Sequence, residues 1–186
     1  DGTYNMLLGC TDMGTGCDTI LVQMAADCLE CRMEDIAVYA SDTDTAPYDS
    51  GSYASATTYV TGMACVRACE ELRGKIIRQG AKMLNLPEEE VAFDGKRVFS
   101  LADETRSADL ASIAYSGQCG CSDVLSATVS HSSPVSPPPF MAGAAEVEVD
   151  PETGHVELID YVAAVDCGTP INPNLARVQT EGGLVQ

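Results

Sequence analysis

The strongest constraint on the fold is an apolar stripe in the middle of the chain. Apolar side chains recur there every four residues, at Val60, Ala64, Ala68, Leu72 and Ile76, with Tyr59 and Met63 alongside. This spacing lies on one face of an α-helix, so a long helix is predicted from about Ala54 to Leu84. Glu71 and Lys75 form a favourable i,i+4 pair on its outside. Gly74 and Gly80 weaken the helix and leave room for a kink or fraying near residue 80.

Strands and a second helix are predicted on the N-terminal side of this helix. Residues 4–9 and 36–41 are short apolar runs typical of buried strands. Between them, a glycine-rich loop leads into a helix that begins near Thr19. The order strand, loop, helix, strand follows from these patterns.

Two antiparallel hairpins are predicted on its C-terminal side. In residues 91–100, Asp94-Gly95 separates two apolar runs and suits a type I′ turn. In residues 146–158, valines alternate with glutamates around a Pro/Gly turn. Helices mixed with antiparallel hairpins indicate an α+β fold.

The remaining segments give weaker predictions. We expect Ser107 to cap a short helix through Tyr115, a strand near 122–130, and a final helix from Asn172-Pro173. The chain is interpreted as one partial domain over 1–186. The proline-rich stretch allows two sub-lobes within it, which are residues 1–115 and 116–186.

The charge of the chain excludes several classes of partner. The formal net charge is -18, and a surface this acidic repels nucleic acid and anionic lipid. No run of apolar residues is long enough to span a membrane, and the N-terminal residues show no secretion signal. We therefore expect a cytoplasmic protein whose anionic ligands are bound by backbone N–H groups and hydroxyls.

The nine cysteines allow two interpretations. In a chain without an export signal, most are expected to be reduced, buried and hydrophobic in character. Alternatively, Cys28, Cys31, Cys119 and Cys121 could form a four-thiolate zinc site. The irregular spacing of the second pair disfavours zinc.

The first candidate site is the loop Gly9–Gly16. Its glycines allow a close backbone approach, and the following helix N-terminus offers N–H groups and a partial positive charge to an anion. The alternative is a tight turn between a strand and a helix, with Asp18 as the N-cap.

The second candidate site is the hydroxyl-rich segment Ser50–Thr58. Its five serine and threonine hydroxyls lie at the expected start of the long helix, where they could form an anion-binding nest. The alternative is ordinary capping by Ser52 or Ser55.

Gln179 is the third candidate. It lies on a helix of mainly small and apolar residues, where its amide could both donate to and accept from a flat heterocycle. The alternative is a solvated surface glutamine. His131 and His155 have no spacing to a nucleophile that would define a triad, so no catalytic residue and no metal ligand is assigned.

These segments together resemble the molybdenum-binding subunit of the xanthine dehydrogenase and aldehyde oxidase family. The resemblance covers essentially the whole chain. Its motifs are matched by Gly9–Thr19, Ser50–Thr58, Thr61–Ala64, Ala145–Val156 and Asp166–Gln186. It implies a molybdenum-cofactor-binding domain type of α+β fold.

The resemblance also implies roles for individual residues. The cofactor, molybdopterin with or without an attached nucleotide, would contact Gly14, Thr15, Gly16, Ser55, Thr57, Thr58 and Gln179. Tyr53 and Ala54 would lie near the molybdenum and the substrate. Two positions depart from the family pattern, since Thr15 replaces a glutamine and Val178 replaces a glycine.

The resemblance finally implies a partial enzyme. The whole would hydroxylate a purine-like N-heterocycle or an aldehyde with oxygen from water, and would pass electrons to iron–sulfur and FAD centres on partner domains or subunits. The family's general-base glutamate is expected beyond Gln186, so the isolated chain would be inactive without the remaining molybdenum-subunit domain. The alternative is a non-catalytic acidic binding module that retains the fold without cofactor.

Overall fold

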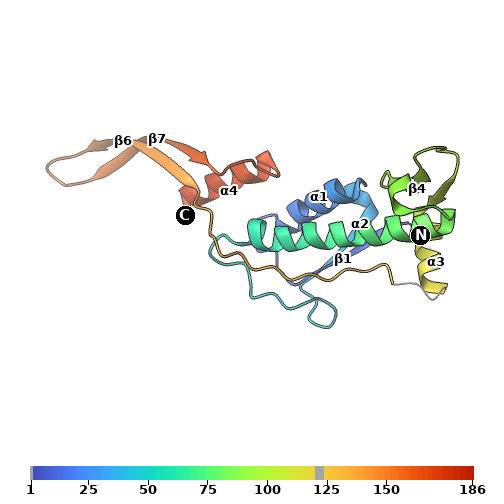
Figure 1. The fold of residues 1–186 in the computed structure, drawn as a ribbon. Coiled ribbons are helices and arrows are strands. Elements are labelled where there is room, and N and C mark those ends of the chain that lie inside the picture. The colour runs from blue at the N-terminus through green and yellow to red at the C-terminus, as the bar shows by residue number, and fades with distance from the viewer. Residues whose placement is uncertain (1, 120–123) are drawn as a thin grey trace. The chain divides into compact units, whose positions relative to one another are not determined.

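The computed structural model describes residues 2–119 and 124–186 (Figure 1). The chain divides into two compact units, Asp1–Pro134 and Val135–Gln186, and each is described by itself. Among the described residues, no helix combines the length and the apolar character needed to cross a membrane.

The first unit begins with a parallel pair of strands joined through a helix. The elements are β1 (Tyr4–Leu8), α1 (Cys17–Leu29), the 3-10 turn η1 (Met33–Asp35) and β2 (Ile36–Ala40). Tyr4 pairs with Ile36 and Leu8 with Ala40. A parallel pair needs a crossover connection, which α1 supplies. The predicted order of strand, loop, helix and strand is therefore confirmed.

The long helix starts later than its apolar stripe predicts. A π-helical turn, η2 (Thr57–Thr61), precedes α2 (Gly62–Leu84). Ala54 and Ser55 have φ angles of 53° and 55°. This left-handed conformation cannot continue into a right-handed helix, so the predicted start at Ala54 is wrong.

The predicted apolar face of α2 is correct in period but is rotated slightly. Cys65, Cys69 and Ile76 are buried, whereas Met63 is 41% exposed. The helix runs unbroken past Gly80, where an added Cβ would lie 2.5 Å from Cβ of Val98. Close packing against β4 therefore holds the helix where fraying was expected.

A small antiparallel sheet and a helix complete the first unit. The elements are η3 (Glu88–Glu90), β3 (Val91–Phe93), β4 (Arg97–Ser100), β5 (Ser107–Asp109) and α3 (Leu110–Cys119). The first predicted hairpin is confirmed, but its turn is not type I′. Within the turn 94–97, only Gly95 has a positive φ, and the Asp94 N–H donates to the Arg97 carbonyl. Glycine at the first central position is typical of type II′.

The predicted cap of the short helix is also corrected. Ser107 lies in β5, and Asp109 accepts hydrogen bonds from the N–H and hydroxyl of Ser112. Asp109 caps α3 because a carboxylate immediately before a helix can accept from its first-turn N–H groups.

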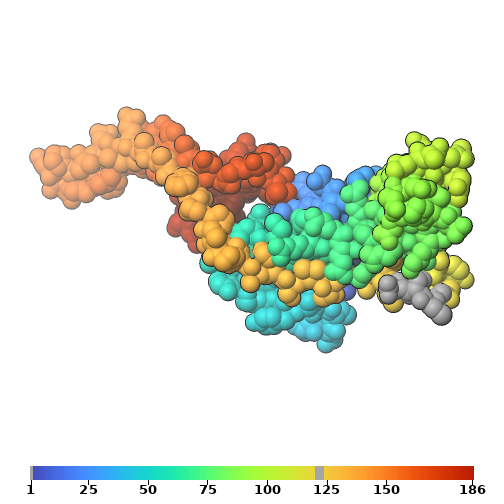
Figure 2. Space-filling view, viewed as in Figure 1, coloured from blue at the N-terminus to red at the C-terminus, as the bar shows by residue number. Residues whose placement is uncertain are grey.

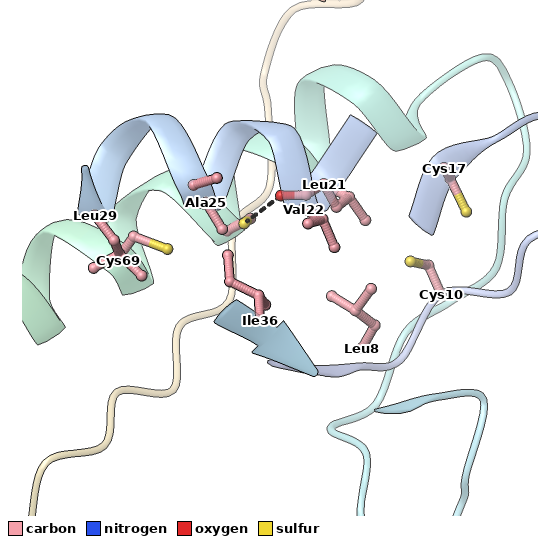
Figure 3. Close-up of a cluster of buried hydrophobic side chains, with 11 residues drawn as sticks. Leu8, Cys10, Cys17, Leu21, Val22, Ala25, Leu29, Ile36 and Cys69 are labelled. Carbon is pink, nitrogen blue, oxygen red and sulfur yellow. Dashed lines mark hydrogen bonds between the residues drawn. The ribbon is translucent and has the colours of Figure 1, made fainter. Parts of the chain in front are cut away.

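Two apolar clusters form the core of the first unit, and α2 contributes to both. The first joins β1, α1, β2 and the start of α2, and includes Leu8, Leu21, Val22 and Ile36 (Figure 3). The second joins the end of α2 with β3, β4, β5 and α3 around Ile76, Val98 and Ile113. α2 therefore links the two halves of the unit.

The segment after α3 is irregular. The strand predicted near 122–130 lies partly outside the described residues, and residues 124–130 contain no strand. Instead, Lys75 donates to the Ser126 carbonyl at 2.7 Å, and Arg67 contacts Nδ1 of His131 at 3.0 Å. These bonds hold the segment along α2 (Figure 2).

The second unit consists of a long hairpin and one helix. The elements are β6 (Phe140–Val149), β7 (Val156–Asp166) and α4 (Pro173–Val185). The Asn172 side chain accepts from the Leu175 N–H, so the predicted start of the last helix is confirmed. The second hairpin is confirmed and is longer than predicted. The whole is an α+β fold, as expected.

Candidate functional site

The loop between β1 and α1 is organised by Asp12. Its Oδ1 accepts hydrogen bonds from the N–H groups of Gly14 and Gly16, at 2.8 and 3.1 Å. Both glycines have positive φ angles, 101° and 78°, which glycine adopts without strain. Two of the N–H groups expected to bind an external anion therefore donate to a carboxylate of the chain itself.

Asp18 is not the N-cap of α1, which the alternative interpretation of this loop assigned to it. The residue before α1 is Gly16, which has no side chain, and Asp18 lies in the first turn of the helix. The N–H groups of Gly14 and Gly16 hold the pKa of Asp12 below its ordinary value. The carboxylate therefore stays charged beside the helix N-terminus, where a negative charge is stabilising.

The second loop, before η2, is shaped in the same way. Oδ1 of Asp49 accepts from the Gly51 N–H at 2.7 Å, and its Oδ2 lies 3.5 Å from the Thr61 hydroxyl. Sequence reasoning singled out the glycines and hydroxyls and missed both aspartates. The Asp-x-Gly spacing at 12–14 and 49–51 is the signal that could have found them, since aspartate favours this type of turn.

The two loops lie against each other. The Ser52 hydroxyl donates to the Thr11 carbonyl at 3.4 Å, and the Ser41 hydroxyl donates to the Thr11 hydroxyl at 2.9 Å. An added Cβ on Gly9 would lie 2.3 Å from the Pro47 carbonyl oxygen. Only glycine allows this approach, so Gly9 positions the second loop beside the first.

The expected site residues of the first unit lie in these two loops and in η2. Gly14, Thr15, Ser55 and Thr58 are exposed, and Gly16 and Thr57 are half-buried. Space beside Gly14 is open, since an added Cβ would meet nothing within 4 Å. Tyr53, at 63% exposure, and Ala54 lie in the second loop. Gln179 lies exposed on α4 in the second unit, and its part in the site stays a prediction.

Two buried thiols lie at the ends of the first loop. Cys10 follows β1, Cys17 begins α1, and their sulfur atoms are turned toward each other (Figure 3). Burial, together with nearby acidic groups, raises the pKa of Cys17 to about 12, and burial also raises the pKa of Cys10. Both thiols stay protonated and act as small apolar side chains.

The cysteines do not gather into the expected zinc site. Cys121 lies outside the described residues, and Cys119 is exposed at the end of α3. Cys28 instead donates to the Val66 carbonyl in the interface between α1 and α2. Within residues 2–119 and 124–186, the one group of closely spaced ligand atoms is Asp12, Cys17 and Asp18, within 4.8 Å of one another. Asp12 is already hydrogen-bonded, so the group is explained by the loop.

The fold is shared with solved oxidoreductases. Quinoline 2-oxidoreductase from Pseudomonas putida 86 matches with a TM-score of 0.79 at 27% identity, over 100% of this chain and 25% of its own. The class of protein that the fold defines is therefore an α+β domain of a type that occurs within larger oxidoreductases.

Relatives in sequence agree with this class. The chain is 37% identical over 187 residues to a probable hypoxanthine oxidase of Escherichia coli K12, covering 100% of this chain and 19% of the relative. It is 31% identical over 183 residues to the carbon monoxide dehydrogenase large chain of Hydrogenophaga pseudoflava, covering 96% of this chain and 23% of the relative. The chain thus spans about a fifth of the length of these relatives.

A family model identifies the family of the chain. The model of the molybdopterin cofactor-binding domain matches residues 1–186. The chain belongs to this family. A match over the whole chain does not favour an acidic module that lacks the cofactor.

Proposed function

We propose that the chain holds the phosphate and pterin of a molybdenum cofactor at the junction of its two glycine loops. The observation that carries the proposal is the hydrogen bond between Ser52 and Thr11, which joins the loop 9–16 to the loop that precedes η2. One ligand can then reach groups from both loops. The acidic chain needs such neutral donors because it has few cations to offer a phosphate.

The donor set fits a pterin phosphate, with one change from the sequence expectation. The N–H groups of Gly14 and Gly16 are engaged by Asp12. We therefore assign phosphate binding mainly to the hydroxyls of Thr15, Ser55, Thr57 and Thr58. No hydrogen bond within the described parts of the chain occupies these four hydroxyls. Asp12 would keep the loop in shape so that Thr15 faces the ligand.

We further propose that the whole protein is a hydroxylase of N-heterocycles. When bound, the cofactor supplies oxygen transfer from water to a C–H bond and accepts two electrons. Two of the similar proteins are named for N-heterocycles, hypoxanthine and quinoline, which favours this class over aldehydes. Tyr53, exposed in the second loop, would lie near that substrate. Gln179 would hydrogen-bond the pterin.

The proposal includes partners that complete the reaction. The chain would work with the remaining molybdenum-subunit domain and with iron–sulfur and FAD domains or subunits that remove the electrons. We also place the complete protein in the cytoplasm, where the acidic composition and reduced cysteines fit.

Metal and pterin analysis tests the cofactor site. The polypeptide expressed from its complete coding sequence in molybdate-replete cells should contain molybdenum and pterin in equal amounts. The double variant Ser55→Ala and Thr57→Val should weaken cofactor binding at least about a hundredfold and so lower both contents, since each lost hydrogen bond to a charged group contributes roughly 1.5–3 kcal/mol. The control Thr128→Val removes an exposed hydroxyl elsewhere in the first unit and should change neither. Molybdenum-free wild-type protein would rule the proposal out.

A further inference from the structure

One face of the β6–β7 hairpin is apolar over its whole length. Paired residues of an antiparallel hairpin point to the same side, and every second residue shares that side. The pairs on one face, here called face A, are Met141 with Val165, Gly143 with Ala163, Ala145 with Tyr161, Val147 with Leu158, and Val149 with Val156. No charged residue occurs among them. The register shift after Glu146 keeps the apolar series in phase.

The opposite face, here called face B, is different. Glu146 pairs with Asp160, and Glu148 pairs with Glu157. Like charges directly opposite each other are destabilising unless water surrounds them. Face B is therefore the solvent side of the outer half of the hairpin.

Within the second unit, face A is nevertheless uncovered. Val147 is 48% exposed, Leu158 61% and Met141 55%. No residue of 135–186 is buried, in the hairpin or in α4. A two-stranded hairpin without a covered apolar face is marginally stable at best in water. An apolar face of this extent marks an interaction surface.

The middle of face A has a shape that admits a close neighbour. Gly143, Ala145 and Ala163 are small, whereas larger side chains lie toward both ends. Tyr161 lies across Gly143, where an added Cβ would be 2.3 Å from its hydroxyl oxygen. The ring therefore lies flat along the strand, and a partner can approach the hairpin closely.

We propose that face A is covered by the remainder of a molybdenum-subunit polypeptide, through an uncharged, apolar surface. The length of the relatives argues for this occupant, since the matched stretch is only 19% and 23% of their chains. The acidic pairs of face B argue that, over the outer half of the hairpin, the partner meets face A and not face B. This inference rests on the proposed function, because it takes the chain to work within a larger subunit.

Hydroxyl-radical footprinting tests the covered face. The polypeptide from the complete coding sequence is compared with the isolated 186-residue chain. Met141 and Tyr161 on face A should be oxidised at least about fivefold more slowly in the complete polypeptide, because a packed interface core excludes solvent. Glu148→Lys and Val147→Lys place the same side chain on adjacent residues of opposite faces. Val147→Lys should reduce the yield of protease-resistant complete polypeptide about tenfold, since a buried unpaired charge is costly, whereas Glu148→Lys should not.

The possible outcomes distinguish a failure of the proposed surface from a failure of the proposed cofactor site. Equal oxidation in both samples overturns the proposal, as does a complete polypeptide no longer than 186 residues. Protection already present in the isolated chain also overturns it, because the chain or a second copy would then cover face A. Circular dichroism of isolated Val147→Lys should match wild type, which excludes misfolding as the cause. If face A is protected but the complete polypeptide contains no molybdenum, only the proposed function is contradicted. If the polypeptide contains molybdenum but face A is not protected, only the proposed surface is contradicted.

Discussion

The N–H of Gly16 donates to the Asp12 carboxylate at 3.1 Å, so the chain's own anion lies at the N-terminus of α1. Helix N-termini attract anions because their first N–H groups lack partners within the helix. In this protein the Asp12 side chain, from the loop before the helix, accepts a hydrogen bond from one of these N–H groups. The loop is thereby shaped before any ligand binds, which lowers the entropy lost on binding.

Removing the Asp12 carboxylate should loosen the loop. Asp12→Ala leaves the N–H groups of Gly14 and Gly16 without their acceptor, and we expect a loss of about 0.5–2 kcal/mol in the free energy of unfolding, as for a helix cap. Hydrogen exchange at these two amides should accelerate. Asp27→Ala, an exposed carboxylate on the same helix, serves as the control. Equal losses in the two variants would show that the loop contacts contribute nothing.

The contribution of Asp12 should depend on pH. Its pKa lies below the ordinary 3.8, because the Gly14 and Gly16 N–H groups stabilise the charged form. A group with a lowered folded pKa stabilises the fold above its unfolded pKa and loses that contribution as the pH falls through the folded pKa. The stability difference between wild type and Asp12→Asn should therefore be largest near neutral pH and shrink below about pH 4. Urea titrations at several pH values measure it, and a difference that grows toward low pH would reverse the sign.

Thr15 offers a test of cofactor affinity. The related family pattern has a glutamine here, and Thr15 is exposed in the first loop. Thr15→Gln should raise the pterin content of incompletely loaded protein by about two- to tenfold, since one added hydrogen bond contributes roughly 0.5–1.5 kcal/mol. Thr15→Val should lower it. Pterin content is measured by fluorescence after oxidation of the released cofactor. Unchanged content in both variants would remove Thr15 from the site.

The cysteines should differ in reactivity according to burial. Cys119 and Cys167 are exposed, whereas Cys10, Cys17, Cys65 and Cys69 are buried. Only a thiolate attacks iodoacetamide, so buried thiols such as Cys17, whose pKa is raised to about 12 by burial, should react more than about tenfold more slowly. Mass spectrometry of the native chain at pH 8 measures each rate. Rapid labelling of Cys17 would show that the base of the loop opens to solvent.

Sequence reasoning succeeded where the signal was local and periodic. The period-four stripe predicted α2, the alternating valines predicted β6 and β7, and Asn172-Pro173 predicted the start of α4. Each of these elements follows from spacings within a few residues of one another. The i,i+4 pair of Glu71 and Lys75 also forms, at 2.8 Å.

The same reasoning failed where distant packing or competing caps decide the structure. Ala54 and Ser55 adopt left-handed φ angles, which alanine and serine rarely choose by themselves, so no local rule predicted the late start of α2. Asp109 rather than Ser107 caps α3, because the helix begins at Leu110, directly after Asp109. In the candidate site, the glycines and hydroxyls could be singled out from the sequence, but the use of their N–H groups by Asp12 depends on the folded loop.

The two interior glycines of α2 provide a matched pair for the packing of the core. Gly74→Ala adds a methyl group where nothing lies within 4 Å, so it should stabilise the protein by about 0.5–1 kcal/mol through helix propensity. Gly80→Ala places the same methyl group 2.5 Å from Cβ of Val98, which is fully buried. The backbone of β4 must shift to accommodate it, and overpacking costs about 1–3 kcal/mol, which exceeds the gain in propensity.

The free energy of unfolding in urea should therefore change in opposite directions for the two variants. The double variant Gly80→Ala with Val98→Ala tests the steric conflict, because it removes Cγ1 and Cγ2 of Val98, two of the three atoms that the new Cβ would meet, and leaves only Cβ of Val98. It should be more stable than the sum of the single changes predicts. Strict additivity would mean that Gly80 is needed for some reason other than its contact with β4.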